Sequence, residues 1–464
     1  MIGGVKASVC AFSDAEQSAL FHHNARRVYR VDALRPQLLD IRWRIQLRWR
    51  HALQKNEGSR QRTRFGEGLM HRSMWTYAWD ILDLGYDRVL GELRDRAGLS
   101  SVSLATSYHA GRFLQPRSPK RKVYFPEDGT IYFHPTAARW ERLAIKPKVA
   151  DIILEGGDVL RELVRRRDAG GLEVCCWTVC LHNTRLGMLH PGAVTRNAFG
   201  DPNYYNLCPS NPDARAYVCA LVEDLTHAYK PDLVELESPS FMGFAHGYHH
   251  DKDGVGLTAE DDFALSLCFC ESCLARARKA GVDGKAARRT IGQWIVEACE
   301  REAPKPRFRD FPGGRIETFR PFPAVYEYLL WRSEPVTSLI AEIKARAHAS
   351  SRVVLIDEGS LGGCDLNEIG KICDGAILCV YGLGPEQGAA VIKEGRAALG
   401  AEKFLGAGFR LFNGEVGGPD GLAARVNACV EAGADGLNFY NYGLIPAPRL
   451  DWIRTAVGDL KPIH

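Results

Sequence analysis

Eight short apolar or β-branched segments alternate with eight helical segments from residue 75 onward, and this alternation constrains the fold more than any other feature. Strands separated by helices are typical of parallel βα units, and eight such units predict an α/β protein of the (β/α)8 TIM-barrel class. The predicted strands are 75–81, 102–108, 173–179, 233–237, 353–357, 376–381, 404–409 and 436–440. The predicted helices are 86–97, 146–167, 213–229, 337–349, 366–373, 385–399, 421–432 and 450–460.

Two long insertions interrupt this regular spacing, one after the second strand and one after the fourth. The first is polar and contains Pro116, Pro119, Pro126 and Gly129, which predicts a β-hairpin loop. The second, at about 238–352, holds the Cys268–Cys273 motif and a predicted helix at 290–300. Both follow the carboxyl ends of strands, where barrel active sites lie, so they are expected to shape a substrate cleft. Contacts within a homo-oligomer are the other interpretation.

The N-terminal segment 1–71 differs from the rest in charge. Residues 1–72 contain 14 Lys and Arg against 6 Asp and Glu, whereas the remaining chain has a net charge of −4. A possible helix at 38–53 carries Arg42, Arg44, Arg48 and Arg50. The predicted organisation is therefore an Arg-rich leader at 1–71 and a barrel domain at 72–464 with an inserted subdomain at about 238–352. The leader is interpreted as a targeting or docking arm, or as an extension upstream of a start at Met70 or Met74.

Composition limits the classes of binding partner and the cellular compartment that are expected for this protein. The positive excess lies in the leader and not in the barrel, which argues against a nucleic-acid partner. No apolar run approaches the length of about 18 residues that spans a bilayer, which argues against a membrane partner. The leader shows no secretory pattern, and 14 cysteines suit a reducing compartment, so a cytoplasmic location is predicted.

Four cysteines are spaced as metal ligands. Cys268, Cys270 and Cys273 form a Cys-x-Cys-x-x-Cys run, and Cys208 lies about 60 residues earlier in Cys-Pro-Ser-Asn-Pro. Three closely spaced thiolates and a remote fourth complete the tetrahedron of a structural zinc site. The alternative is four buried thiols that pack as small hydrophobic side chains.

These two motifs, after predicted strands three and four, resemble those of the glycoside hydrolase family 42 β-galactosidases. The resemblance covers residues 172–278 and implies a barrel, a bound zinc and carbohydrate chemistry. It also implies an Asn-Glu acid/base pair ending strand four and a glutamate nucleophile after strand seven. Strand four here reads Val-Glu-Leu-Glu without the asparagine, and the first carboxylate after strand seven is Glu415.

Glycoside hydrolysis requires two carboxyl groups, and four acidic residues at strand ends are candidates. Glu235 and Glu237 alternate with apolar residues in strand four, so both are expected to point into the barrel. Glu237, nearer the mouth, is predicted to be the acid/base. Its partner is predicted to be Glu358 or Asp357 after strand five, or Glu415, with Glu358 preferred because it lies further toward the mouth. In the alternative interpretation, Glu235 pairs with a barrel arginine and Glu237 caps a loop.

Polar and aromatic residues at the other strand ends suit sugars, whose hydroxyl groups need hydrogen-bond partners and whose C–H faces stack on rings. The predicted substrate-binding residues are Tyr108, His109, Trp177, His182, Asn183, Tyr381, Arg410, Tyr440 and Asn441. The loop His246–His250 either covers the cleft or supplies metal ligands, for example together with Glu237 and His109.

The sequence therefore predicts a glycoside hydrolase that acts on an oligosaccharide or glycoside and contains a structural zinc. A metal-dependent sugar isomerase or lyase and a carbohydrate-binding barrel without catalysis are the two alternatives.

Overall fold

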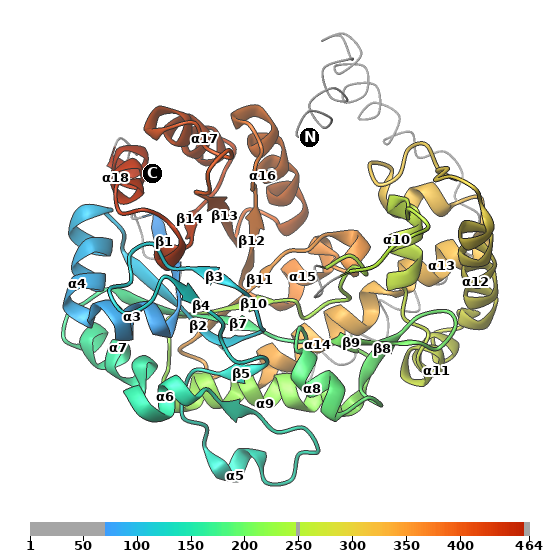
Figure 1. The fold of residues 1–464 in the computed structure, drawn as a ribbon, viewed down its shortest axis with the longest axis horizontal. Helices are drawn as coiled ribbons and strands as arrows, with labels where there is room; N and C mark the ends of the chain where they lie inside the picture. The colour runs from blue at the N-terminus through green and yellow to red at the C-terminus, as the bar shows by residue number, and fades with distance from the viewer. Residues whose placement is uncertain (1–69, 247–250, 459–464) are drawn as a thin grey trace. The chain divides into compact units, whose positions relative to one another are not determined.

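A closed barrel of eight parallel strands forms the body of the protein in the computed structural model, which describes residues 70–246 and 251–458 (Figure 1). Strand β1 pairs with both β2 and β14, which closes the sheet. This confirms the TIM-barrel prediction. The barrel strands are β1 His71–Thr76, β2 Ser101–Tyr108, β7 Glu173–Val179, β10 Leu233–Glu237, β11 Arg352–Ile356, β12 Gly375–Cys379, β13 Phe404–Arg410 and β14 Gly436–Tyr440.

The first strand lies earlier than the sequence pattern predicted. Strand β1 ends at Thr76, and most of the predicted strand 75–81 belongs to helix α3, Ala78–Leu84. The helix begins there because the Asp80 carboxylate accepts a hydrogen bond from the Tyr77 backbone N–H at 3.0 Å, which supports the first turn. The predicted leader, with its helix at 38–53, lies outside the described residues except for Met70 and His71.

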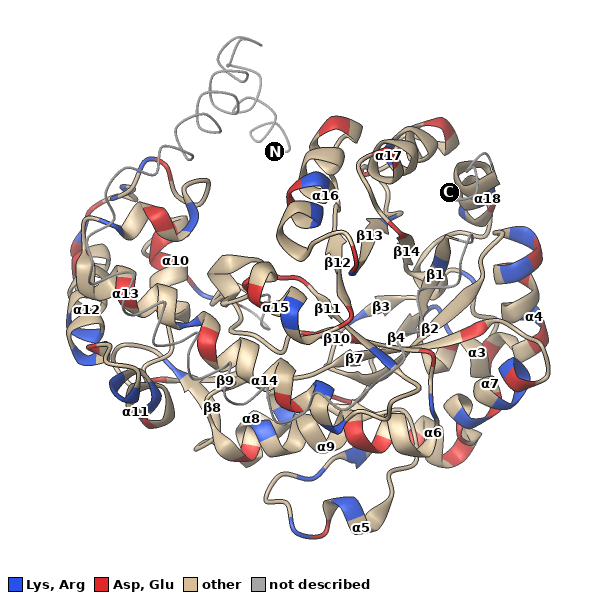
Figure 2. Cartoon of the chain, turned by 180° about the vertical axis from the view of Figure 1, so that it is seen from behind, with Lys and Arg blue, Asp and Glu red and all other residues tan. Residues whose placement is uncertain are grey.

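Outer helices surround the barrel, and seven of the eight predicted helical segments are confirmed with small shifts at their ends. Both acidic and basic residues occur along these helices (Figure 2). The outer helices are α4 Tyr86–Gly91, α7 Val159–Asp168, α9 Pro212–Ala228, α14 Ser333–Arg346, α15 Leu366–Ile372, α16 Pro385–Leu399, α17 Pro419–Glu431 and α18 Arg449–Gly458. None of the helices in the described part of the chain is long and apolar enough to cross a membrane.

The predicted helix 146–167 is divided into shorter elements. Its first residues form strand β6, Lys148–Val149, which is followed by α6, Asp151–Gly156, and then by α7. The break falls at Gly157, whose φ of +91° is a conformation that residues other than glycine rarely adopt. Periodicity alone did not reveal this break.

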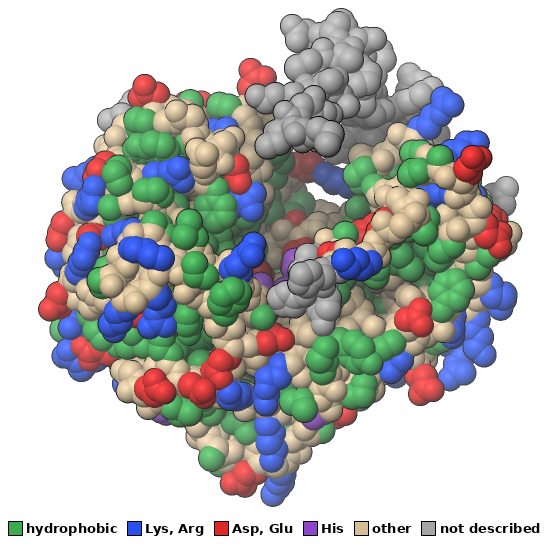
Figure 3. All heavy atoms as spheres, in the orientation of Figure 1, with side chains coloured by type: hydrophobic (Ala, Val, Ile, Leu, Met, Phe, Trp, Pro, Cys, Tyr) green, Lys and Arg blue, Asp and Glu red, His purple; other side chains and the backbone are tan. Residues whose placement is uncertain are grey.

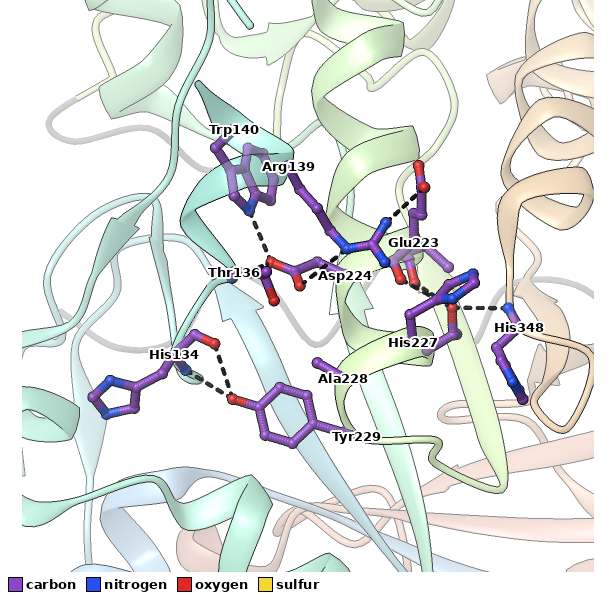
Figure 4. A network of polar contacts seen from close by, with 12 residues as sticks. His134, Thr136, Arg139, Trp140, Glu223, Asp224, His227, Ala228, Tyr229 and His348 are labelled. Carbon is purple, nitrogen blue, oxygen red and sulfur yellow. Dashed lines mark hydrogen bonds and ion pairs between the residues drawn. The ribbon is translucent and has the colours of Figure 1, made fainter. Parts of the chain in front are cut away.

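The insertion after β2 forms the predicted hairpin, β3 Phe113–Leu114 and β4 Val123–Tyr124. Strand β5, Thr130–Ile131, then pairs with β2, and α5, Ala137–Trp140, packs on α9. Asp224 of α9 accepts hydrogen bonds from the Thr136 backbone N–H and the Trp140 indole, both at 2.8 Å (Figure 4). This contact fixes the end of the insertion on the outside of the barrel.

The insertion after β10 is mainly helical. It contains α10 Ala259–Ser266, α11 Glu271–Lys279, α12 Gly284–Glu300 and α13 Pro323–Trp331. Helix α12 begins six residues before the predicted helix 290–300, because Asp283 caps it by accepting from the Ala286 N–H at 3.0 Å. Aromatic rings from the irregular segment 304–323 pack with Phe263 and Trp294, for example Phe311 on Phe263 at 5.4 Å.

Candidate active site and cysteine cluster

Glu237 ends β10 and points into the barrel, as the alternation of side chains predicted. Its carboxylate accepts a hydrogen bond from the indole N–H of Trp177 on β7. Burial raises the pKa of Glu237 to about 7, and repulsion from Glu358 and Glu235 adds to this shift against the opposing Trp177 bond. The group is therefore protonated up to neutral pH, which is the state that a general acid requires.

Glu235 lies one layer deeper and is fully buried. Its carboxylate accepts from the Trp75 indole at 2.6 Å, the Ser103 hydroxyl at 2.7 Å and the Asn438 amide at 3.1 Å. Burial raises the pKa of Glu235, and these three donors oppose the shift. The arginine partner considered from the sequence is not what holds this group. Its surroundings suit an electrostatic role beneath Glu237 better than contact with substrate.

Glu358 follows β11 and approaches the loop after β10. Its carboxylate accepts from the Ser238 hydroxyl at 2.6 Å and from the Ser240 hydroxyl. Ser238 reaches it from a left-handed backbone conformation, with φ of +50°. The side chain remains exposed to a cavity of about 490 Å³, while the packing around the carboxyl raises its pKa against the effect of the two serines.

Asp357 is the less suitable partner. Burial raises the pKa of Asp357 to about 6, and its Oδ1 atom is buried without a hydrogen-bond partner. Glu358, and not Asp357, is among the groups that raise the pKa of Glu237. Glu415 forms an ion pair with Arg410 at 2.6 Å, so its carboxylate already has a partner. Of these three acidic residues, Glu358 is therefore the best-placed partner for Glu237.

An aromatic wall lies beside Glu237. The Tyr77 hydroxyl is 2.9 Å from the hydroxyl of Tyr108 and 3.0 Å from that of Tyr440, and Trp177 packs against all three rings. Tyr77 was not predicted as a site residue, because the first strand was placed too late in the sequence. The inward alternation His71, Ser73, Trp75 and Tyr77 is the signal that could have revealed it.

Three histidines, from the segments that follow β2, β7 and β10, lie close together beside this wall: His109 stacks on His182, and His246 meets His182 edge-on. His109 lies 4.3 Å from the Tyr108 ring and 3.9 Å from His182, and His182 lies 4.6 Å from His246. Burial lowers the pKa of His109 to about 4 and also lowers the pKa values of His182 and His246, so the rings are neutral. Histidine and acidic side chains are visible in the hollow of this face in Figure 3. Residues 247–250, including His249 and His250, lie outside the described residues.

The remaining predicted binding residues divide into two groups. The Tyr381 ring lies 6.2 Å from Tyr440, and the Arg410 guanidinium lies 5.0 Å from the Tyr381 ring, so both belong to the aromatic wall. Asn183 caps the short helix α8, Thr184–Leu189, and Asn441 accepts from the Gly443 N–H at 3.1 Å. Both asparagines therefore stabilise the local backbone after their strands by accepting hydrogen bonds from backbone N–H groups.

The four predicted cysteine ligands converge. The Cys208 sulfur lies 3.9 Å from that of Cys268, 3.6 Å from that of Cys270 and 3.5 Å from that of Cys273. A tetrahedral ion with Zn–S bonds of about 2.3 Å places its sulfurs about 3.8 Å apart, so the cluster fits such an ion. Backbone N–H groups of Arg196, Ser210 and Cys273 point at the sulfurs at 3.3–3.5 Å, which favours thiolates.

The second group of converging ligand atoms in residues 70–246 and 251–458 is His71, Cys175 and Glu235, inside the barrel. Among the described residues, neither Glu237 nor His109 belongs to a group of three or more metal-ligand atoms that lie within 4.8 Å of one another. The alternative metal site considered from the sequence thus has no support from the described residues.

Comparison with known proteins gave structural matches only. No family model and no curated protein matches the chain. It is similar to α-L-fucosidase isoenzyme 2 from Paenibacillus thiaminolyticus, at 14% identity over 84% of this chain and 49% of that one, with a TM-score of 0.49. The chain thus spans about half the length of that structure. The β-galactosidase from Marinomonas ef1 matches at 12% identity over 83% of this chain and 59% of that one, with a TM-score of 0.49. The β-amylase catalytic domain from Paenibacillus polymyxa matches at 11% identity over 82% of this chain and 94% of that one, with a TM-score of 0.48.

Proposed function

We propose that the protein is a glycoside hydrolase in which Glu237 is the general acid and Glu358 the second carboxyl group. The observation that carries this proposal is the position of Glu237 at the carboxyl end of β10, where it accepts a hydrogen bond from the Trp177 indole and lies near a second carboxyl group, Glu358. Burial at this position also raises the pKa of Glu237 to about 7. Two carboxyl groups with different surroundings divide the roles: one stays protonated, and the other accepts two hydroxyl hydrogen bonds that favour its ionised form.

In the proposed reaction, the Glu237 carboxyl donates its proton to the glycosidic oxygen as the bond to the anomeric carbon breaks. Glu358 then either attacks that carbon as a nucleophile or removes a proton from an attacking water molecule. Tyr108, Trp177 and Tyr440 offer ring faces for the sugar. The neutral histidines His109 and His182 offer hydrogen bonds without adding positive charge to the cleft.

We also propose that Cys208, Cys268, Cys270 and Cys273 hold one zinc ion. Four thiolates leave no open coordination position, so the ion would stabilise the insertion after β10 and take no part in bond cleavage. The fit of the sulfur spacing to a tetrahedral ion supports this assignment.

The first test is turnover of a panel of aryl α- and β-glycosides by the purified full-length protein and its Glu358→Ala variant. We expect hydrolysis of at least one glycoside by the wild type and a loss of at least about a hundredfold in the variant. Added azide should restore turnover in Glu358→Ala and yield a glycosyl azide if Glu358 is the nucleophile. Glu162→Gln, on the outer face of α7, is the control. A wild-type protein without turnover on the whole panel contradicts the proposal.

Glu235 offers a test of the electrostatics within the site. Because Glu235 raises the pKa of Glu237 by repulsion, Glu235→Gln should lower that pKa. The pH above which hydrolysis declines should fall by the same amount. An unchanged pH profile in a variant with wild-type thermal stability would show that Glu235 does not act on Glu237.

A further inference from the structure

The amino-terminal half of the barrel interior is polar. In this fold the interior is usually filled with branched apolar side chains such as Val, Ile and Leu. Because buried polar groups need partners, each polar side chain in this layer should contact another polar group or a ligand. The buried polar and ionisable side chains here are His71 and Ser73 on β1, Ser101 on β2, Cys175 on β7, Glu235 on β10 and Asn438 on β14.

Three of these side chains bring metal-ligand atoms together. One ligand atom each of His71, Cys175 and Glu235 lies within 4.8 Å of the other two. The His71 Nε2 atom is 4.0 Å from the Cys175 sulfur and 3.4 Å from the Ser101 hydroxyl oxygen. A tetrahedral zinc ion with bonds of about 2.0–2.3 Å has its ligand atoms about 3.3–3.8 Å apart. Small movements of the side chains would therefore bring all three atoms to one ion.

His71 is oriented as a metal ligand by a carboxylate behind it. Its Nδ1 atom lies 3.5 Å from the carboxylate of Glu173, which begins β7 and whose side chain is 49% exposed. When Nδ1 carries the proton toward this carboxylate, Nε2 keeps a lone pair that faces Cys175. A carboxylate that holds the far nitrogen of a ligating histidine in this way is a usual feature of metal sites.

Unpartnered oxygen atoms lie in the same layer. The Glu235 carboxylate offers about four lone-pair positions and accepts three hydrogen bonds, so it can still bind an ion. The Asn438 amide nitrogen donates to Glu235, but its Oδ1 atom is buried without a partner, as is the hydroxyl of Ser73. Ser73 and Asn438 are paired in register on β1 and β14. These oxygens could complete the coordination of an ion, directly or through a water molecule.

The ligand set also suits the charge of such an ion. One thiolate, one carboxylate and one neutral imidazole balance a divalent cation, so the buried site has no net charge. Sulfur and imidazole nitrogen favour late first-row ions over Mg²⁺ and Ca²⁺. We propose that His71, Cys175 and Glu235 bind a divalent ion of the zinc type, which joins β1, β7 and β10 inside the barrel. A bound ion would offset the repulsion between Glu235 and Glu237, so the Glu235→Gln comparison applies to chelator-washed protein.

Cobalt uptake is the first readout, because a cobalt–thiolate bond gives a charge-transfer band in the near ultraviolet. Zinc-loaded full-length protein is washed with a weak chelator, which leaves zinc only in the four-thiolate cluster, and is then titrated with Co²⁺. We expect the wild type to bind about one equivalent of Co²⁺ with this band, and Cys175→Ala to lose both. Cys176→Ala is the matched control and should bind Co²⁺ like the wild type, because this neighbouring thiol is equally buried but points to the opposite face of β7.

Glu173→Gln tests the orientation of His71 without changing a ligand. The Glu173 side chain is half exposed, so the variant should keep the melting temperature of the chelator-washed wild type. Its affinity for Co²⁺ should fall about 10–100-fold, as is typical when the group behind a metal ligand is lost. Co²⁺ at about a hundred times its Kd should raise the melting temperature of the wild type and Cys176→Ala by about 3 °C, but not that of Cys175→Ala.

Equal uptake of Co²⁺ by Cys175→Ala and Cys176→Ala, or wild-type affinity in Glu173→Gln, would overturn the barrel site. Absence of uptake by the wild type would also overturn it, and the three side chains would then be a hydrogen-bonded set without an ion. Cys273→Ser should still bind one Co²⁺ in the barrel, which distinguishes this site from the four-cysteine cluster. Failure of the cluster or of glycoside turnover would leave the difference of one equivalent between Cys175→Ala and Cys176→Ala as the test.

Discussion

Replacement of Glu237 by glutamine is expected to lower kcat for hydrolysis of an aryl glycoside by at least about a hundredfold, with little change in KM. Glutamine preserves the shape of the side chain and can still accept the Trp177 hydrogen bond, but it has no proton to donate to the leaving oxygen. The loss should be much smaller for a dinitrophenyl glycoside, whose leaving group departs without protonation. Steady-state kinetics on two substrates with different leaving groups would measure this contrast.

The pH dependence of hydrolysis is a second test of Glu237 as the proton donor. Wild-type hydrolysis should decline as the pH rises through about 7, because Glu237 loses its proton there. The variant should lack this decline. An equal loss on both leaving groups, or a loss confined to KM, would instead make Glu237 a binding residue.

The raised pKa also has a consequence for stability. The pKa of Glu237 has its ordinary value of 4.5 in the unfolded chain and is raised to about 7 in the folded protein, so the folded state loses stability as the pH rises between these values. The difference corresponds to at most about 3 kcal/mol. Glu237→Gln should therefore be less sensitive to pH in this window than the wild type, and thermal unfolding at pH 5 and pH 8 would measure the difference.

Disruption of the proposed zinc site is the second change with a large expected effect. Cys273→Ser should reduce bound zinc from about one equivalent to a small fraction, because a hydroxyl is a poor substitute for a buried thiolate ligand. The insertion after β10 should then unfold at a temperature at least about 5 °C lower than in the wild type. Metal analysis and limited proteolysis between residues 267 and 331 would follow both effects.

Cys429→Ser, a buried cysteine on α17 outside the cluster, is the control for loss of packing. It should retain full zinc. Zinc bound equally well by Cys273→Ser would show that the four sulfurs do not form the site, and the cluster would then be a set of packed thiols.

The barrel could be predicted from the sequence because most strands are rich in apolar or β-branched residues and are followed by a helix. Where two signals competed, the prediction failed. The run Trp75–Ile81 is apolar enough for a strand, but the capping contact of Asp80 makes most of it a helix. The glycine at 157 likewise divides an otherwise periodic helix.

Site residues could be predicted only where the alternation of side chains along one strand, or the spacing of residues in one segment, determines where they lie. Alternation placed Glu235 and Glu237 inside the barrel, and the cysteine spacing placed four sulfurs together. The serines that hold Glu358 and the hydroxyl contacts of Tyr77 depend on neighbours from other strands, so no local pattern encodes them.

The attachment of α5 to α9 has a consequence for how this barrel can diversify. Asp224 holds the last part of the insertion after β2 against the outer helix α9. The hairpin of β3 and β4 comes earlier in the same insertion, and its Leu114 and Val123 are 66% and 51% exposed. The tip of the hairpin is held on helix α3, because the Asp83 carboxylate accepts hydrogen bonds from Ser118 at 2.7 Å and from Arg121 at 2.9 Å. Exchange of the outward-facing residues Leu114 and Val123, with the tip retained, is therefore expected to change the surface of this insertion while the scaffold beneath it stays intact.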